Sequence, residues 1–123
     1  MSSLVLAVIL SRVPYEQTFL AIVAQESGGN PHALNVHENA VGILQIRPVM
    51  VDDCNRIVGY IRWTLADRTN PAKSREMYDC FQKHHTHPGD GSEQWARRWN
   101  GGPRGTEKTS TLAYWQNIQR RMK

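Results

Sequence analysis

Residues 14–31 read PYEQTFLAIVAQESGGNP, and this stretch decides how the chain begins to fold. An apolar stripe at helical spacings of four, three and four runs through Tyr15, Phe19, Ile22 and Glu26. The stripe predicts a helix from about Pro14 to Ser27 with this face buried. Gly28-Gly29-Asn30-Pro31 follows at once and ends the helix.

Glu26 is therefore a carboxyl group at the end of a buried stripe. A carboxyl group there loses hydration and keeps its proton more readily, which makes a general acid available near neutral pH. Alternatively, the side chain turns outward at the frayed helix end and pairs with a Lys or Arg. Spacing alone leaves both interpretations open.

The composition predicts one domain, residues 1–123, with a partner that is more acidic than basic. The formal net charge is +4 and the pI is about 9.4. Nucleic acid, anionic membranes and bacterial wall polymers would all suit this charge. No basic stretch interleaves aromatic residues, so we do not expect nucleic-acid binding. Arg97-Arg98 and Arg120-Arg121 are expected to be solvated.

Residues Leu4 to Leu10 form a short apolar run. No Lys or Arg precedes it and no clear cleavage signal follows it, so it is a weak signal-peptide candidate. It is also too short to cross a bilayer. We expect the start of a core helix and no membrane insertion.

The remaining sequence predicts a mainly α fold with a small irregular or β-hairpin element near residues 36–46. Pro48 opens a helix to about Val58, and Asn70-Pro71 caps and opens the next. Ser92 is expected to cap a short helix that Asn100-Gly101-Gly102-Pro103 ends. A final helix follows Thr109-Ser110. Its inward face is predicted to be Leu112, Trp115, Ile118 and Met122.

Several other residues have two interpretations. Cys54 and Cys80 lie on separate predicted helices, and they could pair if those helices pack or remain free thiols. His84, His85 and His87 lack partners at a recognised ligand spacing, so we expect no metal and no cofactor. Trp63 could be a sugar-stacking platform or a lid residue, but core packing is favoured.

Three segments are candidates for chemistry. Glu26-Ser27 is the first. In Gly42 to Pro48, Gln45 is an amide among aliphatic residues, and it could tie the backbone or offer hydrogen bonds to a ligand. Trp99 to Pro103 contains two glycines that let main chain approach a neighbour or a sugar closely.

Together these segments resemble the catalytic domain of the lytic transglycosylase family, within the goose-type lysozyme group. The family pattern is Glu-Ser, Asn-Pro, Ala-x-Gly-Leu-Met-Gln-Ile-x-Pro, Tyr-Asn-Ala-Gly-Pro and Thr-x-x-Tyr. In this chain the matching segments, between about residues 15 and 118, are Glu26-Ser27, Asn30-Pro31, residues 40–48 (AVGILQIRP), residues 99–103 (WNGGP) and residues 111–114 (TLAY).

The resemblance implies a lysozyme-like α+β fold that cleaves peptidoglycan between N-acetylmuramic acid and N-acetylglucosamine. It makes Glu26 the sole catalytic acid and base, and the product a 1,6-anhydromuramic end. The substrate-binding residues it implies are Ser27, Asn35, Gln45, Trp99, Asn100 and Tyr114. We expect a monomer that acts on the bacterial wall, either exported or delivered by a phage as an endolysin.

The chain also departs from the family pattern. Asn35 replaces a frequent Ser, Leu44 and Arg47 replace Met, and Trp99 replaces Tyr. The segment between Glu26 and Gln45 has one extra residue and contains Glu38. If Glu38 faces Glu26, a two-carboxylate hydrolytic muramidase is possible.

Two non-enzymatic alternatives stay open. A silent wall-binding module would keep the basic charge and Trp99 but would have little need for Glu26. A structural component, such as a phage tail-associated subunit, would use the fold as a scaffold. The retained Glu26 argues against both.

Overall fold

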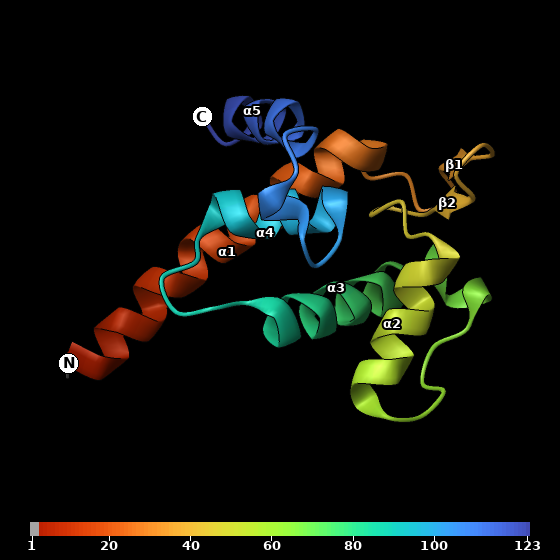
Figure 1. Cartoon of the computed structure of the whole chain (residues 1–123), viewed down its shortest axis with the longest axis horizontal. Coiled ribbons are helices and arrows are strands. Elements are labelled where there is room, and N and C mark those ends of the chain that lie inside the picture. Colours follow the sequence, from red (N-terminus) through yellow and green to blue (C-terminus); the bar gives the residue numbers. More distant parts are fainter. Residues whose placement is uncertain (1–2) are drawn as a thin grey trace. The chain divides into compact units, whose positions relative to one another are not determined.

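The structure, a computed structural model, describes the backbone of residues 3–123 and the side chains of residues 12–123 (Figure 1). The described part is mainly helical and contains one small hairpin, as predicted. In chain order the elements are α1 (Ser3–Ser27), β1 (Leu34–Asn35), β2 (Ala40–Val41), α2 (Pro48–Val58), the 3-10 helix η1 (Leu65–Thr69), α3 (Pro71–His85), α4 (Ser92–Gly101), the 3-10 helix η2 (Gly105–Glu107) and α5 (Thr111–Arg121).

The described chain forms two compact units. Unit 1 combines α1 as far as Gln25 with Thr86–Lys123, and unit 2 is Glu26–His85. The chain passes between the units twice, once inside the last turn of α1 and once directly after α3.

Helix α1 corrects the predicted start at Pro14. The helix begins at Ser3 and continues through Pro14. Proline lacks an N–H group and usually opens a helix; inside a helix it removes one main-chain hydrogen bond, although its fixed φ is close to the helical value. The Thr18 hydroxyl donates a 2.6 Å hydrogen bond to the Pro14 carbonyl. The predicted core role of Leu4 to Leu10 lies outside the described side chains.

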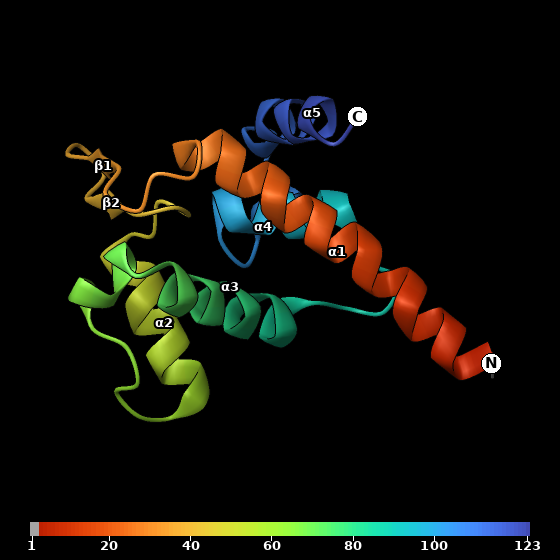
Figure 2. The ribbon, with the colours of Figure 1, turned by 180° about the vertical axis from the view of Figure 1, so that it is seen from behind.

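Unit 1 packs α4 against α5 and contains most of α1 (Figure 2). The Tyr15 and Trp95 rings meet edge to face, with centroids 5.2 Å apart. Ser92 does not cap α4 as predicted. Gly91 occupies the N-cap position, and the Ser92 hydroxyl lies 2.7 Å from the Thr18 hydroxyl on α1, within hydrogen-bond distance.

The inward face of α5 differs from the prediction at its first turn. Leu112 is exposed, whereas Thr111 is buried and Ile118 is fully buried. The Thr111 hydroxyl lies 2.8 Å from the carbonyls of Gly105 and Lys108, and it accepts a hydrogen bond from Arg97. These hydrogen bonds allow a polar residue to occupy the inward position.

Arg98 corrects the prediction of a solvated basic face. Its side chain is buried in unit 1 and donates a 2.6 Å hydrogen bond to Asp90. Burial works to raise the pKa of the Asp90 carboxyl, but hydrogen bonds from Arg98 and the His87 N–H outweigh it and hold that pKa below its usual value. Arg98 and Asp90 thus order the chain before α4.

Unit 2 places the hairpin beside α2, η1 and α3 (Figure 1). Leu34 pairs with Val41 and Asn35 with Ala40 in an antiparallel register. Helices α2 and α3 pack against each other, and their bounds match the predictions closely.

Trp63 is a core residue, as the favoured interpretation predicted. It is 3% exposed, and its indole N–H donates a 3.1 Å hydrogen bond to Glu76 on α3. Asn55 on α2 fixes the backbone here. Its side-chain oxygen accepts hydrogen bonds from the N–H groups of Arg62 and Trp63.

Among the described residues, the helices fall short of the length and apolar character that a transmembrane span requires.

Gly42 marks the tightest backbone contact in unit 2. Its φ is +89°, and a Cβ atom added there would lie 1.9 Å from the Arg68 carbonyl oxygen. Gly59 has the same φ of +89° but has no atom within 4 Å of the corresponding Cβ position. The two glycines therefore differ in available space but share the same φ, which would strain any residue with a side chain.

We expect Gly42→Ala to lower the free energy of unfolding by roughly 2–3 kcal/mol more than Gly59→Ala, which carries only the cost of a positive φ. Urea unfolding of both variants and the wild type measures the difference. Equal destabilisation would show that the Gly42 contact relaxes without cost.

Candidate active site

Glu26 lies in the last turn of α1 and is half-buried. Phe19 and Ile22, on the same helix face, are buried, which confirms the predicted stripe for these residues. Gly28 and Gly29 both adopt positive φ, which ends the helix. The carboxyl group is therefore carried on a regular helix and not on a loop.

Ser27 joins the end of α1 to the segment that follows the hairpin. Its hydroxyl donates a 2.8 Å hydrogen bond to the Ile43 carbonyl and accepts one from the Gly29 N–H. These contacts hold the residue after Glu26 against the turn that contains Gln45.

Residues 41–46 form a tight turn closed by main-chain hydrogen bonds in both directions between Val41 and Ile46. Gln45 lies inside this turn with a φ of +52°, in the left-handed region. Such a conformation is uncommon for a residue with a side chain and costs about 1–3 kcal/mol. Surrounding contacts must therefore hold Gln45 in place.

The Gln45 side chain supplies two of these contacts. Its amide nitrogen donates hydrogen bonds to the carbonyls of Ala33 at 3.0 Å and Gly42 at 3.1 Å. A side-chain amide has two N–H donors, so both are committed to the backbone. The amide oxygen remains as a hydrogen-bond acceptor. Gln45 is thus both a backbone tie and a potential acceptor for a ligand.

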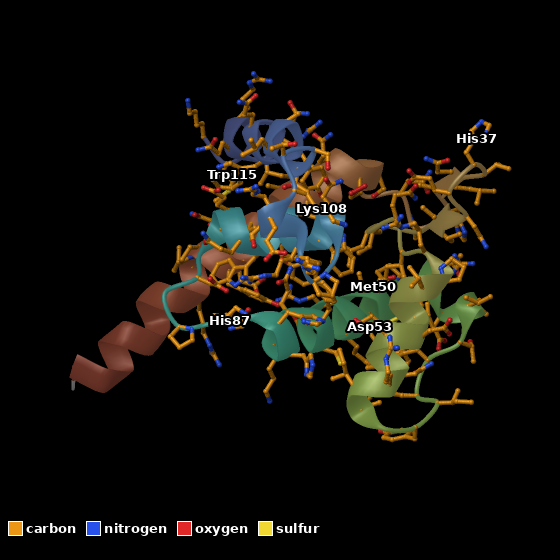
Figure 3. All side chains as sticks on the ribbon, viewed as in Figure 1. His37, Met50, Asp53, His87, Lys108 and Trp115 are labelled. Carbon is orange, nitrogen blue, oxygen red and sulfur yellow. The ribbon has the colours of Figure 1, made fainter. Side chains whose placement is uncertain are left out.

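The hairpin tip carries Asn35, His37 and Glu38, all exposed. The Asn35 side-chain oxygen accepts a 3.3 Å hydrogen bond from the Glu38 N–H, which closes the turn. Figure 3 shows His37 at the outer end of this loop. Glu38 therefore belongs to a solvated turn, whereas Glu26 is half-buried at a helix end.

Arg68 on η1 holds the base of the hairpin. Its guanidinium group is buried and donates hydrogen bonds to the carbonyls of Leu65, Asn39 and Ile46 at 3.0, 2.7 and 3.1 Å. The partners described for it are all neutral oxygens. Burial accordingly lowers the pKa of Arg68 below its usual value.

The other predicted binding residues lie in unit 1. Trp99 is buried on α4, Asn100 follows it and is exposed, and Tyr114 on α5 is half-buried. Gly102, with a φ of +88°, ends α4 by donating its N–H to the Arg98 carbonyl. The helix therefore includes Asn100 and Gly101, and the predicted helix end begins later than expected, at Gly102.

Sequence reasoning missed Arg68 and its partner Asn39, which has a φ of +51°. Arg68 lies in a segment without helical or strand periodicity, so no pattern marked it as buried. One local signal was available. Thr64 and Asp67 have capping-box spacing, and the Thr64 N–H donates to the Asp67 carboxylate at 2.9 Å.

The profile of the transglycosylase SLT domain family matches residues 12–122. The chain therefore belongs to this family. It is also similar to Lysozyme 1 of Crassostrea virginica, with 29% identity over 108 residues that cover 85% of this chain. The chain spans 58% of the length of that relative.

The neutral partners of Arg68 generate a stability prediction. We expect Arg68→Met to lower the free energy of unfolding by about 2–4 kcal/mol, because the part-buried Asn39 carbonyl and the buried Ile46 carbonyl each lose a donor. Arg56→Met is the matched control. The Arg56 side chain is 72% exposed and pairs with Asp53, so its loss should cost less than about 1 kcal/mol. Chemical unfolding curves compare the two, and similar values would contradict the bracing role of Arg68.

Proposed function

We propose that this chain is a peptidoglycan-cleaving glycosidase of the lytic transglycosylase type. The proposed substrate bond is the β-1,4 link between N-acetylmuramic acid and N-acetylglucosamine. The observation that carries the proposal is the half-buried Glu26 on the last turn of α1, in a chain of the transglycosylase SLT domain family. The proposed site of action is the bacterial cell wall.

In the first proposed step Glu26 is a general acid. It gives its proton to the glycosidic oxygen as positive charge develops on the muramic sugar. Glu26 is half-buried at the end of a regular helix, which supports this role by holding the carboxyl group in a fixed place.

In the second proposed step the ionised Glu26 is a general base. It removes the proton from the C6 hydroxyl of the muramic sugar, and that oxygen attacks the anomeric carbon to close a 1,6-anhydro ring. The nucleophile belongs to the substrate, so no protein nucleophile or activated water is required. One carboxyl group therefore serves both steps.

The alternative is a hydrolytic muramidase, in which water attacks the sugar and a second carboxylate assists. Glu38 is the candidate for that second group. Its exposed place in the hairpin tip argues against this role, because a catalytic base must be held near the reacting water. We therefore favour the single-carboxylate mechanism.

Gln45 is proposed to bind the sugar through its amide oxygen, which suits an N–H or O–H donor of the glycan. Trp99, Asn100 and Tyr114 are proposed as further sugar-binding residues. Ser27 and Asn35 use their side chains to hold neighbouring backbone, at Ile43 and Glu38. We therefore propose them as positioning residues of the site and not as direct ligands.

The central test compares Glu26→Gln with Glu38→Gln on purified peptidoglycan. We expect Glu26→Gln to lose at least about 1,000-fold in turnover, because the amide can neither give nor take the proton. Glu38→Gln makes the same chemical change at an exposed site and should retain activity close to wild type. Comparable loss in both variants would favour two carboxylates, and full activity in Glu26→Gln would remove Glu26 from the mechanism.

Product analysis of the wild-type digest tests the transglycosylase chemistry directly. We expect muramic ends that carry the anhydro ring, which are lighter by one water than hydrolytic reducing ends. Mass spectrometry separates the two. Reducing ends alone would replace the proposal with a hydrolase.

For Gln45 we expect Gln45→Ala to lower kcat/KM by about 10-fold, the effect of one lost hydrogen bond to the substrate. Val49→Ala, at an exposed nearby position, is the control and should leave kcat/KM unchanged. Because Gln45 also ties Ala33 and Gly42, the assay should run well below the melting temperature of the variant. Reduced stability with wild-type kcat/KM would limit Gln45 to its structural contacts.

A further inference from the structure

Cys54 and Cys80 lie on two helices that pack against each other in unit 2. Cys54 on α2 is fully buried, and Cys80 on α3 is partly exposed. Each thiol points toward the other helix. The Cys54 thiol donates to the Met77 carbonyl at 3.4 Å, and the Cys80 thiol lies 3.9 Å from the Cys54 carbonyl.

The two thiols are also neighbours of each other. The Cys80 thiol reaches the main chain of Cys54 itself, and the Cys54 thiol reaches Met77, three positions before Cys80 on the same helix. Disulfide formation needs side chains on facing backbone segments, and the packed pair α2 and α3 carries these two thiols on facing sides. Because both residues sit on regular helices, the pair is held by packing.

We propose that Cys54 and Cys80 are a built site for an intramolecular disulfide, which forms when the folded protein meets a small-molecule disulfide and joins α2 to α3. This inference is independent of the proposed enzymatic activity, because it rests only on contacts within unit 2.

The difference in exposure sets the order of the reaction. Burial is the main cause that raises the pKa of Cys54, and it raises the pKa of Cys80 as well. Cys80 is the thiol that solvent can reach, so it attacks first. Its thiolate attacks one sulfur of the small disulfide, forms a mixed disulfide and releases one small thiol.

The Cys54 thiol then loses its proton and attacks the Cys80 sulfur. A protein disulfide forms and the second small thiol leaves. Two protein thiols are oxidised and one small disulfide is reduced to two thiols. The electrons and protons balance without another oxidant.

The link would close a loop that contains η1 and therefore Arg68. The two cysteines are 26 positions apart. Closing a loop of this length restricts the unfolded chain and stabilises the folded one. The segment that Arg68 uses to hold the hairpin would thus be tied at both ends.

The experiment uses the full chain, purified in reduced form and incubated with defined mixtures of reduced and oxidised glutathione. Acid quenching, alkylation and intact mass measurement count free thiols, and peptide mapping identifies the linked residues. We expect a Cys54–Cys80 disulfide in the monomer, formed faster in the native protein than in urea.

Stability provides a second measurement. We expect oxidation to raise the melting temperature on the order of 10 °C. The double variant Cys54→Ser/Cys80→Ser should show no dependence on the glutathione mixture. Three outcomes would overturn the proposal: glutathione retained on Cys80 in the wild type, disulfide-linked dimers, or a link that lowers the melting temperature.

Discussion

The buried guanidinium of Arg68 is the interaction on which unit 2 depends. Its hydrogen bonds reach carbonyls in three places, namely its own 3-10 turn, the end of the hairpin loop at Asn39, and Ile46. Arginine suits this task because its planar group donates in several fixed directions at once. Its own carbonyl lies against Gly42 and accepts a hydrogen bond from Ser74 on α3. One residue therefore joins the hairpin, the following turn and α3.

This bracing explains how two unfavourable backbone conformations persist close together. Asn39 and Gln45 both have φ near +50°, and Arg68 binds the carbonyl of the first and that of the residue after the second. Strain of this kind persists where neighbouring contacts over-determine the backbone. Here the strained segment carries Gln45, whose two N–H donors are used for support while its oxygen remains an acceptor. The amide nitrogen of Gln45 thus supports the backbone, and its amide oxygen is the atom proposed to bind the sugar.

Most of the fold could be predicted because its signals are local. Pro48 and Asn70-Pro71 marked helix starts, and periodic apolar residues marked buried faces such as that of α3. Local rules failed at three places. Pro14 lies inside a helix and does not start it, and Thr111 is buried because the Gly105 and Lys108 carbonyls bind its hydroxyl. Arg68 is buried because partners 22 and 29 positions away accept its hydrogen bonds, which no local pattern can indicate. In the candidate site, the helical spacing of apolar residues predicts where Glu26 lies. The contacts that support Gln45 can be identified only from the tertiary structure.

Glu26 and Gln45 are held in place by different kinds of contact. The position of Glu26 depends on a regular helix that ends at two glycines, a feature encoded within a few residues. The position of Gln45 depends on Ala33, Gly42 and, through Ile46, Arg68. Damage to the long-range contacts should therefore disturb the proposed sugar binding by Gln45 before it disturbs the helix that carries the proposed acid. Arg68 lies between Cys54 and Cys80 in the sequence. A covalent link between α2 and α3 would therefore restrain the segment that supports Gln45, and not the helix that carries Glu26.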